Sequence, residues 1–303
     1  MIKSTSQQIA TTKTDVIQTT PVLSLFTVLK PFEGQADLHQ RNAIASWQAL
    51  GDEVEILLFS DTEIPADLQA SFKCFDILKT NDSGTPLLDE VFRIAAEDGR
   101  GQLRAYINAD ILLDSRWLDA IKQLAGSPHE SFLAIGRRTE LEVDETLGSE
   151  PEEILKNIAS RFAEAERDGE SASIMCKDYF VFTREMYTTI PEFAIGRGNW
   201  DNWMVAHAKS LDVPVVNIAE VAPVIHQKHG YAHVKGGRLS AYVRGEEARN
   251  NQRLAKGTHW FKGSTATWSL GENGMAKKRF PFAQILSDLP GVVALVRNLL
   301  FFR

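Results

Sequence analysis

Short apolar runs alternate with helical periodicity along most of the chain. Residues 22–29 and 54–59 are almost entirely apolar, as expected for strands covered on both faces of a sheet. Thr85 followed by Pro86 is typical of a helix start. Further strands are predicted at 75–78, 103–107, 132–136, 179–182 and 213–218. This alternation predicts an α/β fold in which the strands of a largely parallel sheet are joined through helices.

Three segments depart from this pattern. Residues 1–20 are rich in Ser, Thr and Gln and contain no apolar run of signal-peptide length, which predicts a disordered tail on a cytoplasmic protein. Residues 140–170 are acidic and are expected to form a helical insertion or lid. Residues 280–303 predict an apolar helix that packs on the core or, in the alternative, makes a weak peripheral membrane contact. A single folded domain is then expected over residues 21–279.

The charge balance and the missing motifs exclude several classes of protein. Lys and Arg total 33 against 40 Asp and Glu, which gives a net charge of −7. Binding to a nucleic-acid backbone needs clustered cations, so nucleic acid is excluded as the main partner, although a local basic pocket for phosphate is compatible with this charge. The chain has no GxSxG elbow, Walker loop or HExxH motif, and no GxGxxG follows the first strand.

Polar residues follow the predicted central strand in the run YINADI. Asn108 and Asp110 stand at the carboxyl end of that strand, where open α/β sheets hold ligands. The carboxylate of Asp110 could take a hard divalent cation, which in turn neutralises a diphosphate. It could equally do no more than cap the turn into the next helix. The spacing alone leaves both interpretations open.

Two later segments concentrate side chains that suit sugars and phosphates. Residues 191–203 hold Arg197, Asp201 and two tryptophans, and aromatic faces beside polar groups suit a pyranose. The alternative is that the tryptophans belong to the core and that Asp201 is a helix N-cap. Residues 224–233 bring together three of the seven histidines and Lys228, which are potential metal and phosphate ligands, or only a solvated turn.

The order of these features resembles that of the GT-A-type nucleotide-sugar glycosyltransferases. The runs that carry the resemblance are TVLKPF, GTPLLDEVF, YINADILL, DYFVF, IPEFAIGRGNWDNW and VIHQKHGYAH. Over residues 22–268 they are similar to a little-characterised group of glycosyltransferase-like proteins. The resemblance implies a GT-A-like, mostly parallel sheet flanked by helices. It also implies transfer of a sugar from a nucleotide diphosphate-sugar donor to a glycan or other hydroxyl acceptor.

The resemblance implies roles for the residues of the metal and catalytic sites. Asp110 would hold Mn²⁺ or Mg²⁺ on the diphosphate, together with the distal histidine His226. The first aspartate of the family motif is Asn108 here, which is a weaker, neutral ligand. Asp201 would serve as the base that takes the proton of the acceptor hydroxyl. Asp178 is a rival for the role of catalytic carboxylate.

Donor binding is implied at a further set of positions. Thr27, Lys30 and Asp61 would line the nucleoside pocket. Arg137 or Arg138 would pair with phosphate. The complete set of donor-binding residues is Thr27, Lys30, Asp61, Asn108, Arg137, Arg197 and Lys228.

Two other functions are compatible with these residues. A catalytically silent protein that binds sugars or nucleotide sugars is favoured by Asn108. A nucleotidyltransferase would favour a Gly-rich basic loop directly after the first strand, where the run KPFEGQ offers only Lys30 and Gly34.

Overall fold

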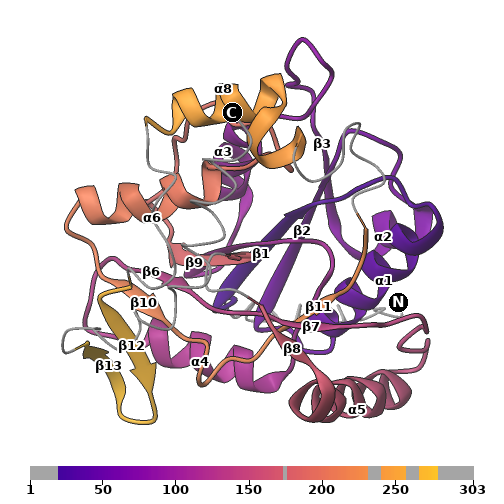
Figure 1. Cartoon of the computed structure of the whole chain (residues 1–303). Helices are drawn as coiled ribbons and strands as arrows, with labels where there is room; N and C mark the ends of the chain where they lie inside the picture. Colours follow the sequence, from indigo (N-terminus) through magenta and orange to yellow (C-terminus); the bar gives the residue numbers. More distant parts are fainter. Residues whose placement is uncertain (1–19, 173–175, 231–239, 257–265, 279–303) are drawn as a thin grey trace, which may run out of the picture.

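Nine strands form the main sheet, in the spatial order β13-β12-β10-β6-β9-β4-β1-β2-β3 (Figure 1). The structure is a computed structural model that describes residues 20–172, 176–230, 240–256 and 266–278. The strands are β1 (Leu23–Val28), β2 (Val54–Ser60), β3 (Lys73–Asp76), β4 (Leu103–Ile107), β6 (Leu133–Ile135), β9 (Tyr179–Thr183), β10 (Val215–Asn217), β12 (Trp268–Gly271) and β13 (Gly274–Lys277). Strand β9 runs antiparallel to β4 and β6, and β13 runs antiparallel to β12, whereas the other pairs are parallel. The expected α/β fold with a mostly parallel sheet is confirmed.

Helices cover both faces of this sheet. Successive side chains of a strand point to opposite sides, so its almost wholly apolar strands present an apolar surface on each face. On one face, Leu23 and Leu25 of β1 belong to the same apolar cluster as residues of α1 (Gly34–Gln48) and α4 (Ser115–Ala125). On the other face, Phe26 belongs to a cluster with α3 (Leu88–Asp98) and α6 (Trp200–Ser210). The remaining helical segments are α2 (Ala66–Ser71), α5 (Pro151–Asp168), α8 (Glu246–Leu254) and the π-helical turn η1 (Ser240–Arg244).

A second sheet of four short strands lies beside the main one, in the order β5-β11-β7-β8. Its strands are β5 (Ile111–Leu112), β7 (Thr139–Leu141), β8 (Glu170–Ser171) and β11 (Ile225–Gln227). Residues 140–170, which were expected to form an insertion or lid, supply most of β7 and all of α5. Ile158 and Phe162 of α5 are buried against Leu141 and Ile225, so this segment packs on the small sheet around an apolar cluster of its own.

Some of the expected segments lie outside the described residues. They are residues 1–19 of the expected tail and the helix expected at 280–303. Within the described part of the chain, no helix combines the length and the apolar character needed to cross a membrane.

Gly136, directly after β6, leaves room for the hydroxyl of Tyr179. A Cβ atom at position 136 would lie 1.7 Å from that hydroxyl oxygen. Tyr179 is fully buried and its ring packs edge-on against Trp117, with centroids 6.0 Å apart, so it cannot move aside easily. We expect Gly136→Ala to lower the free energy of unfolding by about 1–3 kcal/mol through overpacking.

Chemical denaturation checks this expectation, with Gly271→Ala as the matched control. A Cβ atom at position 271 meets no atom within 4 Å. A Gly136→Ala protein as stable as the Gly271→Ala protein would show that the Tyr179 side chain is free to shift.

Candidate active site

Strand register brings together the residues that the sequence singled out. Strands β1 and β4 are parallel neighbours, so Lys30 after β1 and Asp110 after β4 emerge at the same edge of the main sheet. The antiparallel pairing of β5 with β11 places His226 opposite Ile111, next to Asp110. The parallel pairing of β11 with β7 places His226 beside Glu140. The site therefore forms where the two sheets meet at the carboxyl ends of β1 and β4.

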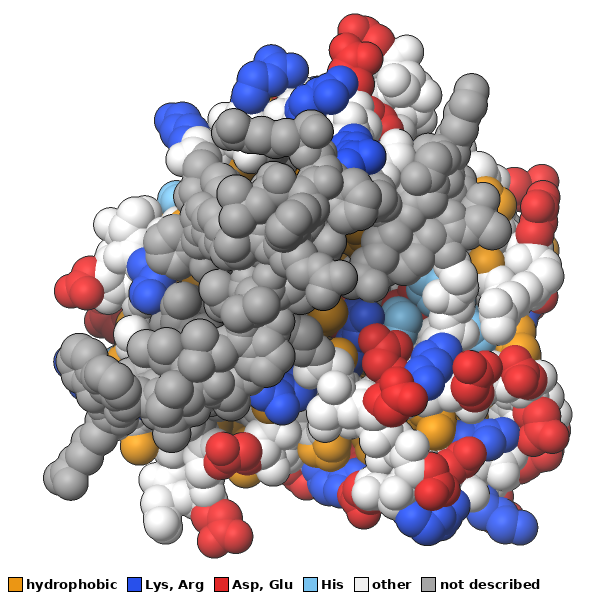
Figure 2. Space-filling model, in the orientation of Figure 1, with side chains coloured by type: hydrophobic (Ala, Val, Ile, Leu, Met, Phe, Trp, Pro, Cys, Tyr) orange, Lys and Arg blue, Asp and Glu red, His pale blue; other side chains and the backbone are white. Residues whose placement is uncertain are grey.

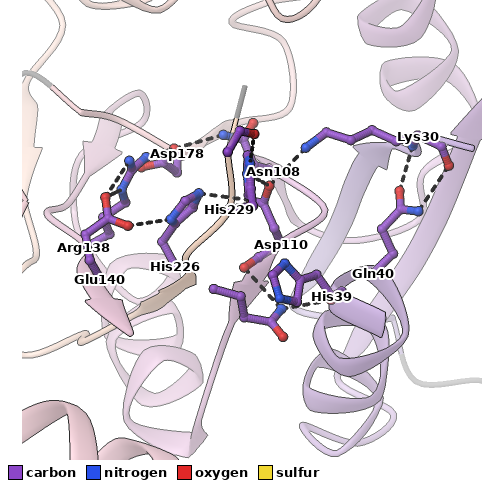
Figure 3. Close-up of polar contacts among 12 residues, drawn as sticks. Lys30, His39, Gln40, Asn108, Asp110, Arg138, Glu140, Asp178, His226 and His229 are labelled. Carbon is purple, nitrogen blue, oxygen red and sulfur yellow. Dashed lines mark hydrogen bonds and ion pairs between the residues drawn. The ribbon is translucent and has the colours of Figure 1, made fainter. Parts of the chain in front are cut away.

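Asp110, His226 and His229 form a cluster suited to a cation (Figure 3). One ligand atom from each lies within 4.8 Å of the others. The Nε2 atom of His229 is 3.0 Å from Oδ2 of Asp110, and the Nε2 atom of His226 is 3.8 Å from Oδ1. That Oδ1 atom is buried and has no hydrogen-bond partner among the described residues. A buried carboxylate oxygen without a partner, with two imidazoles beside the same carboxylate, offers oxygen and nitrogen ligands to a divalent first-row transition metal ion, of which Mn²⁺ is one.

Lys30 supplies a positive charge at the cluster. Its Nζ atom is 3.2 Å from Oδ2 of Asp110. Gln40 of α1 holds the Lys30 backbone at both groups: its Oε1 accepts from the Lys30 N–H at 2.6 Å, and its Nε2 donates to the Lys30 carbonyl at 3.0 Å. Burial alone would raise the pKa of Asp110, but Lys30 and the two histidines hold that pKa well below its usual value. Asp110 is therefore ionised and available to a cation at neutral pH.

A second group of charged residues adjoins the cluster. Arg138 donates from Nη1 to Oδ1 of Asp178 at 2.5 Å and from Nε to Glu140 at 2.8 Å. Asn108 donates from Nδ2 to the same oxygen of Asp178 at 2.9 Å, so its amide is engaged with Asp178. The other oxygen of Glu140 lies 2.6 Å from Nδ1 of His226. Burial would raise the pKa of Glu140, but His226 and Arg138 lower it to about 2.

Asp201 is the second residue of α6 and contacts a buried lysine. The Nζ atom of Lys177 lies 3.4 Å from Oδ2 of Asp201, and the Lys177 side chain is only 1% exposed. The interpretation of Asp201 as the N-cap is wrong, because the helix begins one residue earlier and the N-cap is Asn199, in a left-handed conformation with φ 83°. Lys177 directly precedes Asp178 along the chain.

The other expected donor-binding residues are more dispersed. Thr27 is buried in β1, with a hydroxyl that has no partner among the described residues, and Asp61 is exposed just after β2. Arg137 is exposed, whereas its neighbour Arg138 contacts the site. Arg197 pairs with Glu247 of α8, with Nη2 and Oε2 2.6 Å apart.

The structure also places Lys228 and the two tryptophans of residues 191–203. The Nζ atom of Lys228 lies 3.5 Å from Glu170 on β8. Trp200 is buried against the rings of Tyr106 and Phe180, as the core interpretation predicts, and Trp203 stacks on His207.

Histidine side chains are visible between acidic and basic ones on the face shown in Figure 2.

The sequence did not single out three residues of the site. Two of them were given no role, and the third was named only as an alternative to its neighbour. His229 belonged to a His-rich run but was not assigned, although its spacing of three from His226 was a usable signal. Glu140 gave no local signal, because its contact with His226 joins residues 86 positions apart. Arg138 was an alternative to Arg137, and neighbouring residues on an extended segment cannot be distinguished without knowing which face is buried.

The contact between His229 and Asp110 predicts a pH dependence in the absence of divalent cations. The hydrogen bond to Asp110 raises the pKa of His229 above its ordinary value, although burial opposes this shift. A raised pKa contributes stability below the unfolded value of about 6.5, and this contribution is lost as the pH rises through the folded value. His229→Gln is therefore expected to cost more stability at about pH 6 than at about pH 8.5.

Urea denaturation in the presence of a chelator, at a series of pH values, checks this expectation. The difference in unfolding free energy between the native sequence and His229→Gln should shrink as the pH rises. A difference that stays constant would show that the imidazole does not gain charge from Asp110.

Comparison with known proteins finds similarity only at the level of structure. No protein-family model matches the chain, and no curated protein matches its sequence. The chain is similar to S. aureus TarS in complex with UDP-GlcNAc, with 15% identity and a TM-score of 0.49, over 78% of this chain and 66% of that one. It is also similar to GalNAc-T7 with UDP, GalNAc and Mn²⁺, with 13% identity and a TM-score of 0.47, over 78% and 48% of the two chains.

A third similar structure is the mannosyltransferase PcManGT from Pyrobaculum calidifontis in complex with GDP-Man and Mn²⁺. It is 11% identical, with a TM-score of 0.41, over 68% of this chain and 56% of that one. The chain thus spans between about half and two thirds of the length of these proteins. All three TM-scores lie below 0.5. The function proposed for this chain therefore rests on the side chains of its site.

Proposed function

We propose that this protein is a metal-assisted glycosyltransferase that moves a sugar from a nucleotide diphosphate-sugar donor to a hydroxyl of a glycan or another acceptor. The observation that carries the proposal is the cluster of Asp110, His226 and His229, with Lys30 beside it, at the carboxyl ends of β1 and β4. A divalent cation held by this cluster would supply positive charge against the diphosphate of the donor. Lys30 adds a fixed positive charge on the same side.

The residues around the cluster would take the remaining roles. Asp201 would accept the proton of the attacking hydroxyl, since 22% of its side chain is exposed and one of its oxygens faces Lys177. Asp178 is the rival for this role, but Arg138 and Asn108 both donate to its Oδ1 atom. The Asp178 side chain is also only 7% exposed, against 22% for Asp201, so it is less accessible to an acceptor hydroxyl.

Donor recognition would extend outward from the cluster. Thr27 and Asp61, at the ends of β1 and β2, would line the nucleoside pocket. Arg137 or Arg138 would pair with phosphate. Asn108, Arg197 and Lys228 would complete the donor site.

The second candidate function is a catalytically silent protein that binds nucleotide sugars. It is favoured by Asn108, whose amide is bound to Asp178 rather than offered to a cation. Both candidates need the same cluster, but only the enzyme releases nucleoside diphosphate.

The experiment is an assay of nucleoside diphosphate release from a panel of nucleotide diphosphate sugars, with Mn²⁺ and with a chelator. Slow hydrolysis of at least one donor, dependent on Mn²⁺, is expected even without an acceptor. Binding of a donor without release, both alone and with a range of glycan acceptors, would favour the silent binding protein.

A further inference from the structure

Glu140 contacts the proposed metal site without belonging to it (Figure 3). Its Oε2 atom lies 2.6 Å from Nδ1 of His226. Its Oε1 atom accepts from Nε of Arg138 at 2.8 Å and from Nη2 at 2.6 Å. Because the guanidinium occupies one oxygen, the other is left for a single imidazole nitrogen. The pairing of β11 with β7 fixes this contact, since His226 and Glu140 are partners across the two strands.

This contact decides which nitrogen of His226 carries the proton. A neutral imidazole donates from one nitrogen and accepts at the other. A carboxylate that is paired with Arg138 can only accept, so Nδ1 of His226 must donate to it. The Nε2 atom then holds the lone pair, and it is the atom that faces Asp110. The arrangement leaves His226 with the nitrogen that a metal requires on the side where the other ligands lie.

His229 shows the same orientation by different means. Its Nδ1 atom lies 2.9 Å from the carbonyl oxygen of Gly230, and its Nε2 atom faces Asp110. Both histidines therefore turn Nδ1 toward an acceptor and Nε2 toward the carboxylate. At Nδ1, His226 faces a charged carboxylate, which orients an imidazole more strongly than the backbone carbonyl that His229 faces there.

We propose that Glu140 is a positioning residue that selects the tautomer and the orientation of His226 for cation binding through Nε2. Arg138 holds Glu140 in place and joins it to Asp178, so the metal site and this carboxylate share one network of contacts. The part that concerns the cation rests on the proposed function, whereas the choice of tautomer does not. Outer carboxylates of this kind change metal affinity by about 10- to 100-fold in other metal sites.

The first measurement is the affinity for Mn²⁺ alone, by calorimetry, in Glu140→Gln. The amide has nearly the same volume, but it can donate to Nδ1 as well as accept from it, so it no longer selects one tautomer. We expect about 10- to 100-fold weaker binding of Mn²⁺ in a protein that remains folded. Glu142→Gln is the matched control, because Glu142 follows β7 directly and is exposed, and its affinity should equal that of the native sequence.

The second measurement follows the tautomer itself, in metal-free protein with ¹⁵N-labelled histidine. At a pH well above the ordinary histidine value of about 6.5, nitrogen chemical shifts separate the two tautomers. His226→Asn assigns the signals. The native sequence should show His226 protonated at Nδ1, and Glu140→Gln should show a mixture of the two tautomers.

The outcomes separate this proposal from the proposed function. If the native sequence does not bind Mn²⁺, the metal site and the role of Glu140 in it are both overturned. If Mn²⁺ binds and Asp110→Ala abolishes binding, but Glu140→Gln leaves both the affinity and the tautomer unchanged, only the role of Glu140 is overturned. Weaker binding together with a mixed tautomer in Glu140→Gln supports it.

Discussion

Replacing Asp110 with alanine is expected to weaken Mn²⁺ binding by more than about 100-fold, the upper end of what outer contacts of a metal site contribute. Asp110 is the one carboxylate of the cluster, and its Oδ1 atom is buried with no hydrogen-bond partner among the described residues. Its loss leaves His226 and His229 without the negative charge that balances a divalent cation. The tightening of nucleoside diphosphate binding by Mn²⁺ should disappear with it.

The fold should survive this change. The side chain of Lys30, the cationic partner of Asp110, is 40% exposed and can be solvated by water once the carboxylate is gone. Asp110→Asn keeps the volume and serves as a second variant, and Asp119→Asn, on the exposed face of α4, serves as the control. Calorimetric titration with Mn²⁺ measures the effect. Equal affinity in the native sequence and in Asp110→Ala would place the cation elsewhere.

Asp201→Asn is expected to reduce turnover by about 10²- to 10⁴-fold, the usual contribution of a general base. The amide keeps the volume and can still accept from Lys177, but it cannot take a proton from the acceptor hydroxyl. Donor affinity should stay nearly unchanged, because the interaction that is lost acts in the transition state. The measurement is kcat with a known acceptor, or donor hydrolysis until one is found, together with the donor dissociation constant.

Asp178→Asn tests whether Asp178 rather than Asp201 is the general base. Each substitution takes a charged partner from a buried cation, Arg138 in one case and Lys177 in the other, so the melting temperature of both variants is measured to confirm that they are folded. Full activity in Asp201→Asn, with loss of turnover in a folded Asp178→Asn protein, would move the base to Asp178.

The central strands could be predicted from the sequence because they are buried on both faces. The observed β1 and β4 fall within the predicted ranges 22–29 and 103–107. The predicted start of α3 was wrong. Thr85 followed by Pro86 is typical of a helix start, but the helix begins at Leu88. Pro86 instead forms a β-bridge with Thr80. A tertiary contact thus overrode a local preference.

The site was predictable only in part, because tertiary contacts also decide which of its residues lie together. Asp110 and His226 stand in motifs whose residue types suit a cation, so local sequence and resemblance pointed to them. The inclusion of Glu140 depends on the register of β11 against β7, which joins distant parts of the chain and leaves no periodic signal. The contact of Asn108 with Asp178 likewise depends on the antiparallel register that places the end of β4 beside the start of β9.

The measurement that tests the central claim most directly is a thermal-shift titration with nucleotide diphosphate sugars, in the presence of Mn²⁺ and in the presence of a chelator. A ligand at 100 times its dissociation constant adds about 2.7 kcal/mol to the apparent stability. We predict that at least one donor raises the melting temperature with Mn²⁺, and that the shift is lost with the chelator and in Asp110→Ala. A melting temperature that no nucleotide diphosphate sugar changes under either condition would contradict the assignment of this site to sugar transfer.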